Sequence, residues 1–518
     1  MKNKKKFKLF DAILGTVCLT LVCESVMPTA AIGNTQYFWW ILLLVGFCLP
    51  YGMITAELGT TYPSEGGMYD WVKKAFGPKW AGRVAWNYWI NFPLWIASLA
   101  VAVTDITAGM FGIDLPIWAI LLLQLGYVWL VTFLSTKRIG ESKVVVNTGT
   151  AIKVILLLGI GLLGIYSVLK TGHSANPITS FGDLIPSLDL ESVSFISIIL
   201  FNFMGFEVVG TWVDDMDDPK TQIPKALIFG GLLMAIFYIL PATGFNIALS
   251  PEVVAEMDPE NVVEVLSTLF ASVGISEAVS GTLIIICGVM FIFTFIANIA
   301  SWSFGVNEVA KYAADDGSLP KMFSPVNEEG VPYKAAIING IVASVIVVLG
   351  VIAGEISEDF SASFSLFFCL SWITLLVGYI PMFLAFLKLR KTDAKAKRPY
   401  KMPGSDLWVK TYTMIAFILL VAGVVFTIFG DFTTEYILDS IPLILGVVLS
   451  FIIEEILVAK INPSKNTTYV SAALAVLGLI LVYAHEAMRS VWILLTVGCI
   501  VLCLYNMSVE KKAIKTKK

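Results

Sequence analysis

The chain has 518 residues, of which 57% are hydrophobic and 14% charged, and its mean hydropathy is +0.82. A soluble domain needs a more charged surface than this, so the composition excludes soluble proteins and predicts an all-α polytopic membrane protein. The net charge of −4 says little by itself, because the division of charges between the two membrane faces matters more. No basic patch suggests nucleic acid as a partner.

Apolar segments of ~20 residues, the length that crosses a hydrocarbon core of ~30 Å, recur along the chain. We predict spans near 11–33, 37–60, 84–110, 116–135, 148–169, 192–213, 225–249, 278–310, 334–353, 363–387, 408–429 and 436–458. Two shorter segments, 469–485 and 490–507, raise the total from twelve to fourteen if both of them span. The mildly amphipathic stretch 251–276 is predicted to lie as an external helix over the mouth of the bundle.

The basic residues predict the orientation of the chain. With the N-terminus in the cytoplasm, only Lys170 and Arg489 of the 35 Lys and Arg residues fall outside. Lys153 lies within a span, and all the others lie on the inner face or at its edge. We therefore expect both termini and the basic loop 388–407 to be cytoplasmic, in a plasma (inner) membrane.

Two of the predicted spans are interrupted in the middle. The first contains Val22-Cys23-Glu24-Ser25-Val26-Met27-Pro28, in which an acid lies close to a proline, and the sixth sets Gly205 and Glu207 among apolar residues. Two broken helices in corresponding halves are typical of secondary transporters. The alternative is a proline-kinked helix of purely structural importance, because neighbouring helices can satisfy the freed backbone groups.

A broken helix offers backbone groups to a ligand. We expect the N–H groups of Ser25, Val26 and Met27 to face a carboxylate, and the carbonyl groups of 201–205 to accept from an ammonium. Gly205 would allow the backbone a close approach.

Three ionisable residues stand inside these spans. Glu24 could pair with a substrate ammonium, carry a proton or brace the first break as a neutral acid. Glu207 has a proton or gating role, or braces the sixth-helix break. Lys153 needs an anionic or carbonyl partner, unless its amine snorkels to the inner interface.

Several motifs together are similar to one family. They are Ala56-Glu57-Leu58-Gly59, Tyr62-Pro63-Ser64-Glu65-Gly66-Gly67-Met68-Tyr69, Lys74-Ala75-Phe76-Gly77-Pro78, Gly205-Phe206-Glu207, Ala314-Asp315-Asp316-Gly317-Ser318-Leu319-Pro320 and Arg398-Pro399-Tyr400-Lys401-Met402-Pro403-Gly404. In order and spacing they resemble the amino acid-polyamine-organocation superfamily. The Val22-Cys23-Glu24 break is closest in appearance to the bacterial glutamate/GABA antiporter branch, and the motif at 314–320 is also similar to arginine/agmatine and lysine/cadaverine antiporters.

The resemblance implies a LeuT-like fold, a five-plus-five inverted repeat with discontinuous first and sixth helices. It divides the chain into a cytoplasmic N-terminus (1–10), a ten-helix transport core (11–387), the basic loop (388–407), additional helices (408–507) and a cytoplasmic tail (508–518). It also implies that Lys153 bridges the first and eighth helices, and that Phe201 and Trp302 line or gate the site. Each aromatic residue could instead be packing or part of the interface belt.

The candidate substrate-binding residues are Glu24, Ser25, Val26, Met27, Phe201, Phe203, Gly205, Phe206 and Trp302, with Lys153 and Glu207 for coupling or gating. The predicted function is secondary active transport of amino acids by alternating access, as exchange of an amino acid for its decarboxylated amine. The alternatives are a polyamine or agmatine/putrescine exchanger and a proton-coupled symporter. We expect a small-molecule substrate, a lipid bilayer, a possible homodimer, and no metal or cofactor. A receptor or an enzyme is disfavoured, the enzyme because no His, Cys or Asp cluster has catalytic spacing.

Overall fold

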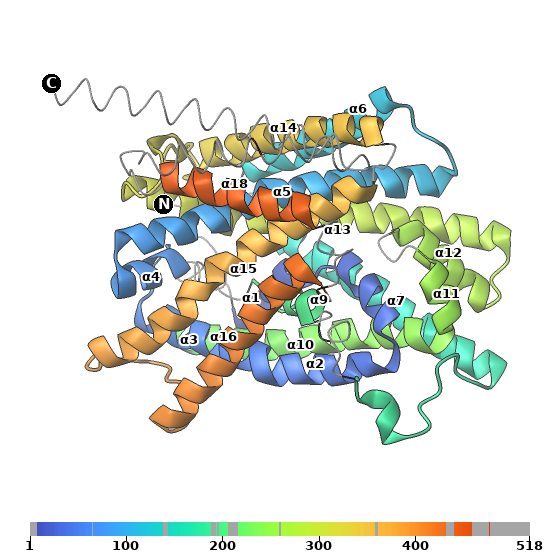
Figure 1. Ribbon diagram of the computed structural model, residues 1–518, viewed down its shortest axis with the longest axis horizontal. Helices are drawn as coiled ribbons and strands as arrows, with labels where there is room; N and C mark the ends of the chain where they lie inside the picture. The colour runs from blue at the N-terminus through green and yellow to red at the C-terminus, as the bar shows by residue number, and fades with distance from the viewer. Residues whose placement is uncertain are drawn as a thin grey trace.

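The computed structural model describes residues 8–64, 66–137, 143–187, 193, 196–205, 216–257, 261–357, 361–430, 432, 440–457 and 476, and its regular elements are helices (Figure 1). The first group is α1 (Leu9–Thr20), the 3₁₀ helix η1 (Glu24–Thr35), α2 (Gln36–Leu43), the π-helical turn η2 (Leu44–Cys48), α3 (Leu49–Thr61), α4 (Met68–Phe76), α5 (Pro78–Phe111), α6 (Ile117–Ser135) and α7 (Lys143–Thr171). The second group is η3 (Phe181–Leu184), α9 (Ile196–Phe201), α10 (Pro219–Ala248), α11 (Pro251–Glu256), α12 (Val262–Ser272), α13 (Glu277–Asp315), η5 (Lys321–Phe323), α14 (Tyr333–Ser357), α15 (Ser361–Thr392), α16 (Asp406–Phe429) and α18 (Ile441–Leu457).

Within the described residues, nine helices are long and apolar enough to cross a membrane. The prediction of an all-α polytopic membrane protein is therefore confirmed. The first predicted span corresponds to α1 and η1, the sixth begins with α9, and the twelfth corresponds to α18. The predicted segments 469–485 and 490–507 lie outside the described residues, apart from the single residue 476.

The helices pair in a way that reveals an internal repeat. Helices five places apart in the order of spans contact each other, as α3 does with α10, α5 with α13, α6 with α14 and η1 with α9. Contacts also recur between the halves, since α1 packs on α10 as α9 packs on α2, and α5 packs on α15 as α13 packs on α7. Because successive spans alternate in direction, a shift of five reverses the direction of each helix. The arrangement is the expected five-plus-five inverted repeat.

Helices α7 and α10 cross closely near the centre of the bundle. A Cβ atom added at Gly164 would collide with the backbone of Gly244, and one added at Gly161 would lie 2.7 Å from Leu240 Cγ. Small residues allow membrane helices to approach in this way, where packing replaces the hydrophobic effect as the driving force. The crossing fixes the distance between two helices that both reach the break in the first helix.

The two ends of the bundle carry different elements (Figure 1). The short helix α4 and the turn between α15 and α16 lie at one end, and η3, α11 and α12 lie at the other. The prediction of one external helix over 251–276 is wrong, because two short helices, α11 and α12, occupy this stretch. Helix α11 ends at Glu256, where Met257 takes an extended backbone, and Asn261 Oδ1 caps α12 by accepting from Glu264 N at 3.1 Å. Both helices contact η1, so they cover the second half of the first span.

Candidate functional site

The predicted break in the first helix is present, and a tyrosine from α10 occupies it. Regular α-helix ends at Thr20, and helical turns resume only at Glu24, as a 3₁₀ helix. The fully buried Tyr238 hydroxyl accepts from Val22 N at 2.8 Å and donates to Thr20 O at 3.1 Å. Tyr238 thus satisfies one donor and one acceptor that the break removes from the helix ladder.

Lys153 of α7 reaches the same break. Its side chain is 1% exposed, and its Nζ donates to Leu21 O at 2.5 Å. The amine therefore points into the bundle and not toward the inner interface, as a snorkelling lysine would. Helix α7 also packs against α13, the eighth span, so Lys153 lies on the helix that contacts both partners of the expected bridge.

The sixth-helix break lies against the first. Helix α9 ends at Phe201, and the next residue, Asn202, is completely buried. The Ser25 hydroxyl lies within hydrogen-bonding distance of Asn202 Oδ1 and, at 2.8 Å, of Val22 O. Asn202 Nδ2 has no hydrogen-bond partner among the residues that the structure describes. We call the contact between the two breaks, formed by Ser25, Asn202, Lys153 and Tyr238, the helix-break junction.

Gly205 and Trp302 close one side of the helix-break junction. Gly205 has a φ of 107°, a region that L side chains rarely adopt. A Cβ atom there would lie 2.8 Å from Trp302 Cζ2 and 2.9 Å from Thr20 Cγ2. The indole of Trp302 is surrounded by further rings, with centroids 6.2 Å away in Tyr88 and 5.9 Å away in Trp95. Such an aromatic surface suits a cation or an apolar chain.

Phe201 and Phe203 lie at the junction, but each packs on aromatic rings of other helices. The ring centroid of Phe201 lies 5.3 Å from that of Phe368 and 5.2 Å from that of Trp372, both in α15. The ring centroid of Phe203 lies 5.6 Å from that of Trp40, with the two ring planes nearly perpendicular. These contacts hold the end of α9 against α2 and α15.

The backbone groups expected to bind substrate are partly occupied. Val26 N donates to Cys23 O at 3.4 Å, so this donor already has a partner. Phe201 O accepts from Met204 N at 3.0 Å, so that carbonyl already has a partner. The side chains of Glu24 and Met27, and all of 206–207, which includes Phe206 and Glu207, lie outside the described residues.

The side-chain roles of two residues of the junction were not predicted from the sequence. Asn202 carried a usable signal, because an amide within an interrupted apolar span is costly unless it is satisfied. Tyr238 carried none, since it is one of 17 tyrosines and stands in an uninterrupted apolar run.

A second polar site lies at the α4 end of the bundle. The carboxylate of Glu57 is 2% exposed and accepts from Arg390 Nε at 2.9 Å and Nη2 at 2.5 Å, from Arg398 Nε at 3.1 Å and from Met402 N at 2.7 Å. We call these four residues the Glu57 cluster. It fastens α3 to the turn between α15 and α16. The motifs containing Glu57 and Arg398 carried this signal, because an acid and an arginine near span ends can pair.

The end of α13 is tied to α4 by Asp316. Its carboxylate lies 2.5 Å from Lys73 Nζ and also accepts from the Tyr69 hydroxyl, which is 2.8 Å from Ser318 Oγ. Burial pushes the pKa of Asp316 upward, but the bonds from Lys73 and Tyr69 outweigh it and lower the pKa below its usual value. The bond to Asp316 raises the pKa of Lys73. Gly77, with a φ of 88°, ends α4 and lets the chain turn directly into α5 at Pro78.

Comparisons of the sequence with known proteins find a matching family and several relatives. The sequence profile of the family described as amino acid permease matches residues 7–452. A probable agmatine/putrescine antiporter of Lactococcus lactis is 42% identical over 464 residues, covering 89% of this chain and 96% of that protein. An uncharacterized transporter of Legionella pneumophila is 25% identical over 431 residues, with 82% and 89% of the two chains covered.

Among solved structures, a mutant of the Eremococcus coleocola manganese transporter superposes with a TM-score of 0.48 at 13% identity, covering 86% of this chain and 95% of that one. The family match spans most of the chain, including both helix breaks, Lys153 and the Glu57 cluster. The chain therefore belongs to the amino acid permease family, which is a family of multi-pass membrane transporters of the amino acid-polyamine-organocation superfamily and not of enzymes.

Proposed function

We propose that this protein is an antiporter that exchanges agmatine for putrescine, one molecule at a time, at the helix-break junction. The observation that carries the proposal is the junction itself, where two broken helices meet in the middle of the bundle through Ser25 and Asn202. Alternating access requires a site that both halves of the repeat share, and this junction is such a site.

The chemistry of the junction supports a cationic substrate. Agmatine and putrescine are positively charged at both ends near neutral pH and have an aliphatic middle. Aromatic rings around Trp302 can stack over a guanidinium or an ammonium, and the hydroxyl of Ser25 and the amide of Asn202 can accept from it. The amine of Lys153 is directed at Leu21 O, so its charge is held by a backbone carbonyl. The 42% identity to a probable agmatine/putrescine antiporter supports the same substrate class.

Glu24 would supply the attraction for the substrate. An ionised carboxylate in the first turn after the break can pair with an ammonium or a guanidinium, and it can also take up a proton. Lys153 would hold the first helix in register, as the superfamily resemblance implies, and Glu207 would gate the sixth-helix break.

The alternative substrate is an amino acid exchanged for its decarboxylated amine, as in the glutamate/GABA branch that Val22-Cys23-Glu24 resembles. An amino acid carries a carboxylate that a diamine lacks, so it would compete for the Val26 N–H and would also use Asn202 Nδ2, which has no partner among the described residues. The two substrate classes would therefore contact different groups of the junction.

The orientation follows from charge. We propose that the end carrying α4 and the turn between α15 and α16 is cytoplasmic, with both termini on that side of the plasma membrane. The ten-helix core of 11–387 would move the substrate, and a homodimer stays a prediction.

Counterflow in proteoliposomes tests the proposed function. Vesicles loaded with unlabelled putrescine should take up labelled agmatine many times faster than empty vesicles. Loading with glutamate or GABA should give no acceleration. Acceleration by glutamate or GABA alone, or equal uptake into empty vesicles, would refute diamine exchange.

The Glu24→Gln variant separates the two classes further. A close charged contact is worth up to ~4 kcal/mol at an effective dielectric of ~20, so agmatine binding should weaken by as much as ~1000-fold. Calorimetry at about pH 5 and about pH 7.5 measures the agmatine affinity of the wild type and of the Glu24→Gln variant. Unchanged agmatine affinity would remove Glu24 from the substrate contacts.

A further inference from the structure

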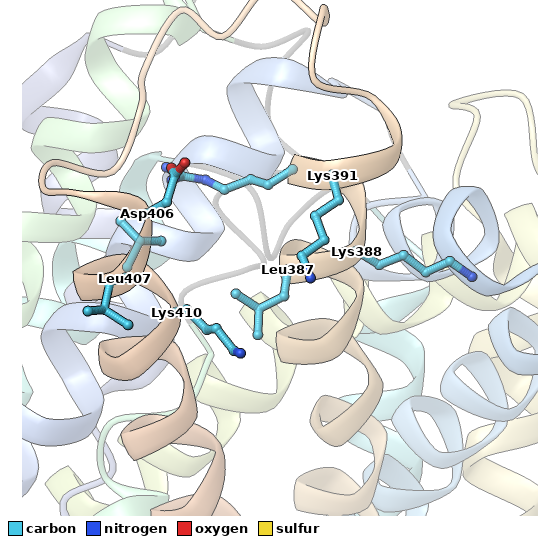
Figure 2. Close-up of a pocket in the computed structure, with 8 residues that line it drawn as sticks. Leu387, Lys388, Lys391, Asp406, Leu407 and Lys410 are labelled. Carbon is cyan, nitrogen blue, oxygen red and sulfur yellow. The ribbon is translucent and has the colours of Figure 1, made fainter.

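A cavity of about 510 Å³ lies between the end of α15 and the start of α16 (Figure 2). Four basic residues, one acid and three aliphatic residues line it. Both helices are membrane-spanning, and the cavity adjoins the turn that joins them, so it lies where spans meet the headgroup region. Its position is separate from the helix-break junction.

Only two of the four basic residues direct their charge into the cavity. The guanidinium of Arg390 belongs to the Glu57 cluster, and Lys388 lies over the ring of Phe76 with Nζ 4.7 Å from the centroid. Figure 2 shows Lys388 extending away from the space between the helices, whereas Lys391 and Lys410 extend into it from opposite sides. Lys391 and Lys410 are therefore the ammonium groups that an occupant would meet.

Asp406 also lines the cavity, and its charge has to be counted. It stands in the first turn of α16, where the positive end of the helix dipole stabilises a carboxylate. Lys391 and Lys410 together outweigh it, so the cavity keeps a positive balance even without Arg390 and Lys388. An anion is the charge-complementary ligand.

The apolar part of the site points to the rest of the ligand. Leu387 lines the cavity, and Leu407, at its edge, is 74% exposed. The neighbouring Trp408 is 52% exposed, at the depth where aromatic belts meet lipid headgroups. A soluble anion would leave these surfaces uncovered, whereas a lipid would cover them with its acyl chains.

We propose that this cavity binds one anionic phospholipid, with its phosphate between Lys391 and Lys410 and its acyl chains over Leu387 and Leu407. Basic pockets between membrane helices bind such headgroups. The bound lipid lies beside Arg390, so it stabilises the turn that the Glu57 cluster fastens to α3.

The test is lipid retention by the purified full-length protein, measured by native mass spectrometry after reconstitution with phosphatidylglycerol or phosphatidylcholine. The variant is Lys391→Gln/Lys410→Gln, and the matched control is Lys395→Gln/Lys397→Gln, which removes two exposed charges from the same turn outside the cavity. Wild type and control should retain phosphatidylglycerol in preference to phosphatidylcholine. The cavity variant should bind it about 10- to 30-fold more weakly, since each lysine contributes ~1 kcal/mol.

Three results would overturn the proposal. The first is undiminished phosphatidylglycerol retention in the cavity variant. Thermal unfolding midpoints show whether all variants are folded. Equal loss in both double variants would mean general attraction to a basic surface. Competition by inorganic phosphate at millimolar concentration would mean a site for a free anion.

Discussion

The helix-break junction and the Glu57 cluster hold helices together by different chemistry. The described contacts of the junction join neutral groups and one ammonium on a backbone carbonyl, whereas Glu57 binds two guanidinium groups and a backbone N–H at once. A neutral hydrogen bond contributes ~0.5–1.5 kcal/mol, but removing one partner from a buried ion pair costs ~3–5 kcal/mol. On the proposed function, the junction exchanges its weaker hydrogen bonds for those of a substrate, whereas the cluster keeps its shape.

The largest expected effect is on the stability of the cluster. Glu57→Ala leaves Arg390 and Arg398 without their buried carboxylate, and should cost ~3–5 kcal/mol of unfolding free energy. The midpoint of thermal unfolding in detergent measures the loss. The control is Glu328→Ala, which removes an exposed acid and should cost less than ~0.5 kcal/mol. Equal midpoints for the two variants would show that the cluster does not fasten the turn.

Lys153→Ala should have the next largest effect, on transport. It removes a charge-assisted hydrogen bond worth ~1.5–3 kcal/mol, so exchange should slow by ~10- to 100-fold in a protein that remains folded. Lys153→Arg should also fail, because a planar guanidinium cannot replace a compact ammonium in a tight site. Lys170→Ala is the matched control, since Lys170 Nζ on the same helix donates to Val273 O at 2.8 Å but is exposed. Normal exchange by Lys153→Ala would show that this lysine has no role in transport.

Gly205→Ala should slow exchange about tenfold. A left-handed backbone costs an L residue ~1–2 kcal/mol, and the new Cβ would press on Trp302. Gly52→Ala in α3 is the control, because a Cβ there meets nothing within 4 Å. If both alanine variants exchange at the same rate, Gly205 is not part of the moving junction.

Asp316→Asn should give the smallest change, ~0–1 kcal/mol, because the ion pair with Lys73 is partly exposed. The folded pKa of Asp316 is lowered, so its stabilisation is complete above about pH 4 and is lost as the pH falls through the folded value. Thermal midpoints of wild type and variant should therefore differ by a constant amount from pH 5 to pH 8. A difference that grows or shrinks in that window would assign the titration to another group.

The sequence was most informative where a membrane imposes a strict rule. A segment that crosses the membrane needs ~20 apolar residues and has to form a helix. The helix bounds were therefore predicted closely, and α5 and α16 begin and end near their predicted limits. The two breaks were predictable because Pro28 and Gly205 stand beside acids within apolar runs. The stretch 251–276 was not, because its weak amphipathic pattern did not reveal that α11 ends at Glu256 and α12 begins at Val262.

The partners across the junction could not be predicted in the same way. Tyr238 satisfies the first-helix break from 216 residues away along the chain, and nothing in its local sequence distinguishes it from other tyrosines. Lys153 was identifiable as a buried cation, but its partner, the Leu21 carbonyl, lies at the first-helix break 132 residues away along the chain. Such partners follow from three-dimensional packing, which a single sequence does not encode locally.

The most direct test of a shared site is a double-mutant cycle on agmatine affinity with Ser25→Ala, Asn202→Ala and the double variant, in nanodiscs. If the two breaks bind substrate together, each single variant should weaken binding by ~2- to 10-fold, and the double variant should lose less than the product of the two. Unchanged affinity in all three variants, or losses that multiply independently, would contradict a single site at the helix-break junction.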